Sequence, residues 1–349
     1  MKKTIAILPG DGVGPEVISC AVEVLKKIGQ KFNHQFKFLE GIIGHQAILK
    51  TGDPLPKKTL EVVEKSDAVL FGAIGDPYYD QNPHLKVRPE QGLLKLRKTL
   101  GLFANLRPIK VFPSLVDNSP LKKEIVEEVD FIVVRELIGG IYFGKKGSEE
   151  DFAFDTATYT KEEILRVSRL AFELARKRRK KITLVDKANV LETSRLWRKT
   201  VQELAKNYPD VSLEMMYVDN AAMQIIKKPK EFDVILTENM FGDILTDEAS
   251  VITGSIGLLP SASIGEKSAL YEPIHGSYPK AAGKNIANPV GAILSAAMML
   301  DFSFSLKKEA QAIEKAVEKA ISAGVGTYDI NKENPVSTSQ LTQKIIEFI

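Results

Sequence analysis

The 349-residue sequence contains a single cysteine and no long hydrophobic run. One cysteine, Cys20, excludes a disulfide within the chain and fits a reducing compartment, so we expect a cytoplasmic protein. Cys20 lies in an apolar stretch with helical spacing, which predicts a buried structural thiol rather than a nucleophile. No segment approaches the roughly 20 apolar residues that a membrane-spanning helix requires, so no membrane partner is expected.

The sequence also lacks a strong excess of charge of either sign. It has 48 Lys and Arg against 45 Asp and Glu, which gives a formal net charge of +3. This balance gives no reason to expect nucleic acid as a partner. One basic run, Arg176 to Lys181, closes a predicted helix, where cations oppose the helix dipole. We interpret it as a solvated helix end, with a nucleic-acid patch as the alternative.

Several common catalytic signatures are missing. The four histidines show no metal-ligand spacing, and neither a nucleophile elbow nor a Walker sequence occurs. The segment from Leu8 to Glu16 is rich in glycine and joins a predicted strand to a predicted helix. Its third glycine comes one residue too early for the G-x-G-x-x-G fingerprint, and Pro15 follows. Because proline suits a first helical turn, we interpret the segment as a tight strand-to-helix turn.

Short apolar runs alternate with amphipathic segments along the chain. This alternation predicts an α/β fold with a largely parallel sheet. The length is sufficient for two domains, but composition shows no boundary between them. The spacing of apolar residues predicts helices over about 15–28, 161–178 and 306–321, and strands over 4–8, 68–71, 131–134, 182–185 and 234–236.

Three arginines could bind a substrate with two carboxylates. Arg97, Arg107 and Arg135 lie near predicted strand ends or in a polar cluster, and the guanidinium fork matches a carboxylate in a bidentate manner. Each arginine taken singly is better explained by a surface position or an ion pair. Leu93 and Leu94 belong either to the core or to an apolar pocket for a substrate side chain.

Carboxylates and a lysine form a further cluster. Asp243 and Asp247 are four residues apart in a predicted helix, so they share one face and repel unless a cation lies between them. A hard divalent ion such as Mg²⁺ fits, with Asp219 as a third ligand; the alternative is two solvated aspartates. Lys187 follows a predicted strand and is either a general base or a solvated side chain.

These clusters occur together and in order, and the sequence resembles the β-decarboxylating dehydrogenases, the family of isopropylmalate, isocitrate, homoisocitrate and tartrate dehydrogenases. The likeness extends from about residue 4 to about residue 329. It is carried mainly by the runs 239–247, 271–277 and 285–289. A non-catalytic subunit of this family would be expected to lose metal or base residues, but every one that we can name is present.

The resemblance implies a two-domain α/β fold with a large mixed sheet, and not a G-x-G-x-x-G Rossmann domain. The cofactor-binding domain would be discontinuous, over 1–102 and 255–349. The domain for substrate, metal and dimerisation would cover 103–254. The glycine-rich opening would then be a turn at the cofactor cleft rather than a cradle for the pyrophosphate.

The segment 90–97 discriminates between substrates within the family. Isocitrate enzymes carry a serine and an asparagine before the first of the three substrate-binding arginines, which corresponds to Arg97. Here the segment reads EQGLLKLR and resembles the isopropylmalate type. Leu93 and Leu94 would receive the isopropyl group. The implied reaction is oxidative decarboxylation of 3-isopropylmalate to 4-methyl-2-oxopentanoate with hydride transfer to NAD, a step of leucine biosynthesis. Homoisocitrate, isocitrate and tartrate or malate-type substrates are the alternatives, as is NADP.

The resemblance also implies a role for each matching residue. Lys187 of the partner subunit would take the C2 hydroxyl proton, Tyr142 would protonate C3, and Glu90 would lie between the substrate side chain and the nicotinamide. Because two subunits would share each site, we expect a homodimer at least. Arg97, Arg107, Arg135, Asn189 and Val190 would complete the substrate site, and Asp243, Asp247 and the partner subunit's Asp219 would bind Mg²⁺ or Mn²⁺.

The implied cofactor site contains one departure from the family pattern. NAD-using members usually have an aspartate, which accepts from the ribose 2′-hydroxyl, where this chain has Lys280. A lysine cannot accept and would favour a 2′-phosphate, whereas Ala281 and Ala287 are NAD-like. Because an isopropylmalate-type site usually goes with NAD, we expect NAD, and the alternative for Lys280 is a side chain that points to solvent. The expected cofactor residues are Ile264, Gly265, His275, Gly276, Ser277, Lys280, Ala287, Asn288 and Asp329.

Overall fold

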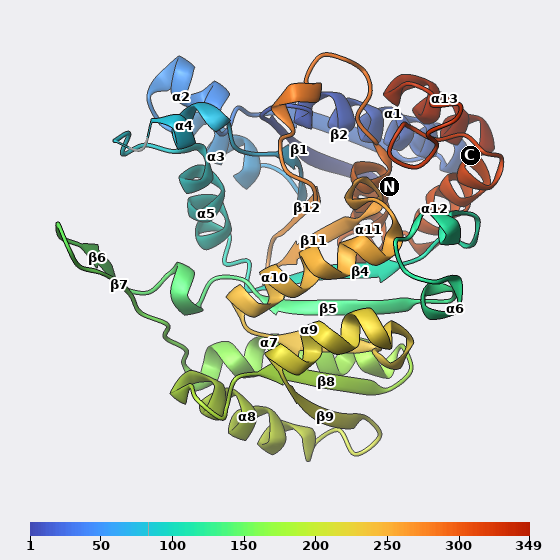
Figure 1. Cartoon of the computed structure of the whole chain (residues 1–349). Helices are drawn as coiled ribbons and strands as arrows, with labels where there is room; N and C mark the ends of the chain where they lie inside the picture. Colours follow the sequence, from blue (N-terminus) through green and yellow to red (C-terminus); the bar gives the residue numbers. More distant parts are fainter. Residues whose placement is uncertain (83) are drawn as a thin grey trace. The chain divides into compact units, whose positions relative to one another are not determined.

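The computed structural model describes residues 1–82 and 84–349, and the chain falls into two compact units. The first unit comprises Met1–Leu100, Gly254–Ala262 and Glu266–Ile349. The second comprises Gly101–Thr253 and Ser263–Gly265. The two ends of the chain, blue and red in Figure 1, therefore build one unit, and the middle of the chain builds the other.

The strands of the first unit follow the order β2-β1-β3-β12-β11. Strand β1 runs parallel to both β2 and β3, and β3 is also parallel to β12. All six residues of β3 are buried, which is typical of a parallel strand covered on both faces. The bounds are β1 Lys2–Gly10, β2 Gln35–Glu40, β3 Ala68–Ala73, β11 Pro260–Ile264 and β12 Ala269–Pro273.

Helix α11 lies at the centre of the first unit. It contacts α1, α12 and β12, and its residues are buried on almost every side, as expected for a helix that is apolar all round. Within the described part of the chain, no helix combines the length and apolarity needed to span a membrane. The bounds are α1 Gly14–Phe32, α2 His45–Thr51, α3 Lys57–Glu64, α4 Pro77–Gln81, α5 Pro89–Thr99, α11 Val290–Phe302, α12 Lys307–Ser322 and α13 Thr338–Phe348.

The glycine-rich segment between β1 and α1 forms the tight turn that its sequence predicts. Gly12 has a φ of +58°, and a Cβ there would lie 1.9 Å from the Ser277 carbonyl oxygen, so only glycine fits without strain. The amides of Asp11, Val13 and Gly14 donate to the carbonyls of Ala73, Ser277 and Asp11. The N–H groups at the start of α1 are thus already paired inside the protein.

The strands of the second unit are mixed in direction and follow the order β4-β5-β10-β8-β9. Strands β4 and β5 are antiparallel, whereas β5–β10, β10–β8 and β8–β9 are parallel. The α/β class with mixed strand directions is confirmed. The bounds are β4 Ala104–Lys110, β5 Asp130–Glu136, β6 Lys146–Ser148, β7 Ala153–Asp155, β8 Lys181–Asp186, β9 Ser212–Tyr217 and β10 Val234–Thr237.

Helix α7 shows why local signals located its start better than its end. The helix begins at Lys161, as the spacing of apolar residues predicts. Thr160 and Glu163 form a capping box at this start. The helix ends at Arg176, two residues before the expected end, and the chain then turns through Lys180, whose φ is +60°. The helices of this unit are α6 Lys123–Val126, α7 Lys161–Arg176, α8 Glu192–Ala205, α9 Val218–Lys227 and α10 Asn239–Ser250.

The basic run after α7 is not simply solvated, which corrects the sequence-based interpretation. The Arg178 Nε donates to Asp233 at 2.8 Å, and the Asp233 side chain is 1% exposed. The Arg176 guanidinium pairs with Asp210 at 2.8 Å. The run therefore ties the end of α7 to neighbouring loops through carboxylates that lie far away in the sequence.

Candidate functional site

One face of α5 presents four of the predicted site residues together. Glu90, Leu93, Leu94 and Arg97 are spaced at i, i+3, i+4 and i+7 of a regular helix, so their side chains share a single stripe. Leu93 is buried and Leu94 half-buried, whereas Glu90 is exposed. The stripe thus offers an acid and a guanidinium with two leucines between them.

The Arg97 side chain has a buried donor, Nε, from which no described residue accepts a hydrogen bond. Its Nη2 donates to Glu272 of β12 at 2.8 Å, and both side chains are largely buried. The Arg97 Nε is also buried but has no hydrogen-bond partner among the described residues. A buried donor without an acceptor is costly in free energy, and a substrate carboxylate would relieve that cost.

The second unit brings the other two arginines and the paired aspartates together. Arg135, at the end of β5, pairs with Asp243 of α10. Arg107 of β4 lies 3.7 Å from a carboxylate oxygen of both Asp243 and Asp247. The predicted helical spacing of the two aspartates is confirmed, because both lie in α10 one turn apart. Two cations and two anions therefore meet along one face of α10.

The electrostatic surroundings separate the two aspartates. Burial opposes ionisation of Asp243, but Arg135, Arg107 and a hydrogen bond from Tyr142 outweigh it and hold the pKa of Asp243 below its ordinary value. Burial raises the pKa of Asp247, and the negative charge of Asp243 adds to that rise. Asp243 is therefore the more firmly ionised ligand candidate.

Tyr142 lies beside this cluster with its proton in place. Its hydroxyl donates to Asp243 Oδ2 at 2.9 Å. Burial raises the pKa of Tyr142, and the Asp243 charge raises it further. The phenol is therefore protonated at neutral pH, as a proton donor must be.

Lys187 and Asp219 form a second, separate group in the same unit. Lys187 directly follows β8, as predicted, and its ammonium pairs with Asp219 in the first turn of α9. This hydrogen bond lowers the pKa of Asp219. Asn189 and Val190 are exposed on the loop after Lys187, where Val190 keeps 59% of its surface open to solvent. The predicted base and the predicted third metal ligand thus lie on one surface.

The oxygen ligands near α10 suit a hard divalent ion. The Asp243 and Asp247 side chains are 37% and 67% exposed, so each can still reach an ion. An all-oxygen set of one or two carboxylates and water is what Mg²⁺ and Mn²⁺ prefer. Across residues 1–82 and 84–349, no three His, Cys, Asp or Glu side chains of a single chain are grouped to hold a metal.

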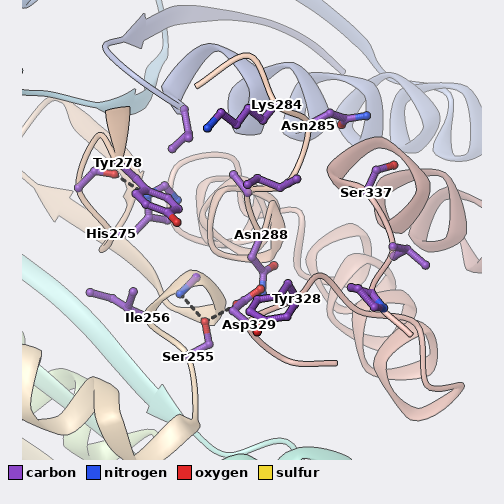
Figure 2. A pocket seen from close by; sticks show the side chains of 17 residues that line it. Ser255, Ile256, His275, Tyr278, Lys284, Asn285, Asn288, Tyr328, Asp329 and Ser337 are labelled. Atoms are coloured by element: carbon purple, nitrogen blue, oxygen red, sulfur yellow. Dashed lines mark hydrogen bonds between the residues drawn. The ribbon is translucent and has the colours of Figure 1, made fainter. Parts of the chain in front are cut away.

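The first unit contains a cavity of about 680 Å³, a volume typical of ligand sites. Figure 2 shows its lining, which comes from the loops around His275 and Asn288 and from the segment 328–337. Five predicted cofactor residues line it, namely His275, Gly276, Ala287, Asn288 and Asp329.

Two side chains in this cavity have features that suit a nucleotide. The His275 Nδ1 is 2.9 Å from the Gly276 carbonyl, which makes Nδ1 the protonated nitrogen and leaves Nε2 an acceptor. That Nε2 is buried with no partner among the described residues. Asp329 accepts from Thr327, Asn288 and Ser255, so its carboxylate is held rigidly at the wall.

Four other predicted cofactor residues do not line this cavity. Ser277 is buried and its carbonyl accepts from Val13, and Lys280 is exposed in a short turn. Ile264 and Gly265 group with the second unit. Sequence reasoning missed several residues that do line the cavity, among them Val13, Ser255, Ile256, Tyr278, Lys284, Ile286, Tyr328 and Val336. Tyr278, Ile286 and Tyr328 adjoin predicted residues in the sequence, but exposed side chains such as Tyr278 carry no sequence signal of their own.

Comparison with known proteins identifies close relatives along the whole chain. A family model described as isocitrate/isopropylmalate dehydrogenase matches residues 4–345. A 3-isopropylmalate dehydrogenase of Bacillus licheniformis is 57% identical, over 97% of this chain and 94% of the relative. Another of Aquifex aeolicus is 55% identical, over 99% of this chain and 97% of the relative.

Solved structures agree with these relatives. The crystal structure of isocitrate dehydrogenase from Methylococcus capsulatus superimposes with a TM-score of 0.90 at 35% identity, covering 99% of each chain. A β-decarboxylating dehydrogenase from Thermococcus kodakarensis gives a TM-score of 0.81 at 38% identity, covering 99% of this chain and 96% of that one. The similarity thus extends across both units.

Proposed function

Because the chain belongs to the isocitrate/isopropylmalate dehydrogenase family, we propose that it oxidises and decarboxylates 3-isopropylmalate with hydride transfer to NAD, a step of leucine biosynthesis in the cytoplasm. The α5 stripe carries this proposal, because Leu93 and Leu94 lie between the charged Glu90 and Arg97. The cavity-bearing first unit then binds the cofactor, and the second unit binds the metal and most of the substrate.

The substrate is held by its charges and selected by its apolar side chain. Arg97, Arg107 and Arg135 bind the two carboxylates, and the unpaired Nε of Arg97 gives one of them a ready donor. The two leucines, with Asn189 and Val190 of the partner subunit, surround the isopropyl group. A third carboxylate, as in isocitrate, would place a charge against the leucines without a partner, which is strongly unfavourable.

Proton transfers are divided between two residues. Lys187 of the partner subunit, as the neutral amine, takes the proton of the C2 hydroxyl when C2 is oxidised. After CO₂ leaves, Tyr142 donates its proton to C3, and Asp243 orients the phenol for that step. Asp243, Asp247 and the partner subunit's Asp219 would hold a divalent ion, which when bound would supply Lewis-acid polarisation of the oxygen on C2.

NAD is the proposed cofactor. The first unit offers the free acceptor of His275 and a cavity wall that includes Ile256 and Ile286. Lys280 is exposed and is not among the residues that line the cavity, which favours the interpretation that it points to solvent. NADP remains the competing cofactor, because Lys284 does line the cavity and could meet a 2′-phosphate.

Initial rates of reduced-nicotinamide formation test substrate and cofactor together. With Mg²⁺ and NAD, we expect kcat/KM for 3-isopropylmalate to exceed that for isocitrate by about 100-fold or more, because an unpaired buried charge costs several kcal/mol. Homoisocitrate, tartrate and malate serve as further comparisons. A preference for NADP would overturn the cofactor assignment, and a preference for isocitrate or homoisocitrate would overturn the assignment of the leucine pocket.

A homodimer with shared sites is the second part of the proposal. The β6–β7 hairpin has Phe152 and Phe154 exposed by 61% and 45%, with ring centroids 5.9 Å apart. An isolated two-stranded hairpin is at best marginally stable in water. Met223 on α9 and Ile244 on α10 are also exposed, on helices that contact each other. A second copy of the chain would cover both surfaces, and Ile244 is the neighbour of Asp243.

The double substitution Phe152→Ser and Phe154→Ser is expected to shift the protein from dimer toward monomer. Specific activity should fall in proportion, because a monomer lacks the partner's Lys187. Light scattering coupled to size exclusion gives the mass at several concentrations. Phe302→Ser, at an exposed phenylalanine of the first unit, is the matched control. A fully active wild-type monomer would contradict the shared site.

A further inference from the structure

A buried polar cluster lies behind the turn that carries Tyr142, and the proposed mechanism assigns it no role. Glu136 ends β5, Tyr159 precedes α7, and Asn239 is the first residue of α10. Glu136 and Asn239 are fully buried, and Tyr159 is 8% exposed. Polar side chains are rarely buried this deeply unless each has a defined set of partners.

Glu136 holds the backbone of the turn. Its two carboxylate oxygens accept from the amides of Ile138 at 3.1 Å and Gly139 at 2.8 Å. The next residues, Gly140–Tyr142, form the short helical turn that ends on Tyr142. The carboxylate of Glu136 thus fixes the two amides that immediately precede the catalytic turn.

Asn239 connects this turn to Arg135 and to α10. Its Nδ2 donates to the Gly139 carbonyl at 3.0 Å, and its Oδ1 accepts from the Arg135 Nε at 2.9 Å. The same residue begins the helix that bears Asp243. One side chain therefore sets the spacing of the turn, the substrate-binding guanidinium and the helix that carries the metal-ligand candidates.

Tyr159 closes the cluster. Its hydroxyl accepts from the Asn239 amide at 3.0 Å, which satisfies one of the open N–H groups at the start of α10. Its ring fills the space beside Gly139 and Gly140, where an added Cβ would lie 2.7 Å and 2.4 Å from tyrosine atoms. Gly140 also has a φ of +72°, a backbone conformation that residues other than glycine rarely adopt.

We propose that Glu136, Asn239 and Tyr159 are positioning residues that hold Tyr142 in place relative to Asp243. This inference rests on the proposed function, because it requires Tyr142 to be the proton donor. A displacement of about 1 Å at a reacting group can cost about 100-fold in rate. The cluster restricts that displacement through backbone contacts that substrate never touches.

Two mild substitutions test the inference. Glu136→Gln keeps the shape of the side chain, but its amide group replaces only one of the two carboxylate oxygens that accept the N–H bonds. Tyr159→Phe keeps the ring and removes only the acceptor for Asn239. We expect each to lower kcat roughly 10- to 100-fold while KM for the substrate changes less than about threefold. Glu203→Gln, at an exposed acid of the same unit, is the control.

A double-mutant cycle separates positioning from a general structural role. In a Tyr142→Phe background, Glu136→Gln should lower kcat less than about threefold further, because the group that it positions is already gone. If Glu136→Gln and Tyr159→Phe act with the same fold-loss in both backgrounds, or leave kcat unchanged while Tyr142→Phe lowers it, the inference is wrong. If Tyr142→Phe itself has no effect, the proposed role of Tyr142 is wrong instead. Thermal unfolding of each variant shows that it is folded.

Discussion

Lys187→Met is expected to lower kcat by about 10²–10⁴-fold, the range that general acid–base groups contribute. Methionine keeps most of the length of the side chain and removes its ammonium group. Folding should change little, because the Lys187–Asp219 pair is 29% and 62% exposed, and solvent screens the attraction between exposed charges. Steady-state rates of reduced-nicotinamide formation and a thermal unfolding curve measure the two effects separately.

Mixing two inactive variants tests whether Lys187 acts on the partner's substrate. Lys187→Met and Asp243→Asn damage different halves of each proposed shared site. Random pairing of equal amounts, after dissociation and reassembly, should restore about a quarter of the wild-type activity, because each mixed dimer keeps one intact site. If mixing restores nothing while mass analysis confirms mixed dimers, then Lys187 and Asp243 act within one chain.

Asp233→Ala is expected to destabilise the protein by about 3–5 kcal/mol, the usual cost of breaking a buried ion pair. Asp233 is 1% exposed, and its carboxylate accepts from the Arg178 guanidinium at 2.8 Å and the Arg179 amide at 2.9 Å. Alanine leaves the Arg179 amide and the Arg178 Nε without this acceptor, and the Arg178 guanidinium keeps, among the described residues, only its contacts with Asp130. Denaturant unfolding followed by circular dichroism measures the change in free energy of unfolding.

The same basic run supplies the control for that measurement. Asp210 pairs with Arg176, but both side chains are more than a third exposed. Asp210→Ala should therefore leave the free energy of unfolding nearly unchanged, because solvent screens this ion pair. Asp233→Asn, which keeps the acceptor shape without the charge, should lie between the two alanine variants. Equal effects at positions 210 and 233 would show that burial is not the cause.

Much of the local structure follows from the sequence because helices and strands have short, regular repeats. The predicted helices over 15–28 and 306–321 correspond to α1 and α12, and the predicted strand over 182–185 lies within β8. The spacing of Asp243 and Asp247 places both on one face of α10, and the spacing of residues 90–97 produces the α5 stripe. The side chains that make each pattern are near neighbours in the sequence, three or four residues apart in a helix and two apart in a strand.

The family resemblance reaches further than this periodicity. It depends on whole motifs, such as 239–247 and 271–277, and the family and fold class that it implied are confirmed by relatives above 50% identity and by solved structures. It could not foresee features particular to this chain's own packing. Tyr278 and Tyr328, which line the cavity, are examples, because exposed side chains follow no periodic pattern.

Tertiary structure alone decided which charges meet. Arg135 pairs with Asp243, 108 residues later in the chain, and Arg178 pairs with Asp233, 55 residues later. Glu136, Tyr159 and Asn239 likewise come from three distant segments. Sequence spacing describes the direction of a side chain from its own helix or strand, whereas its partner is set by how the elements pack. Burial then determines whether a charge such as Asp233 stabilises the fold or is merely solvated, and burial is a property of the folded chain.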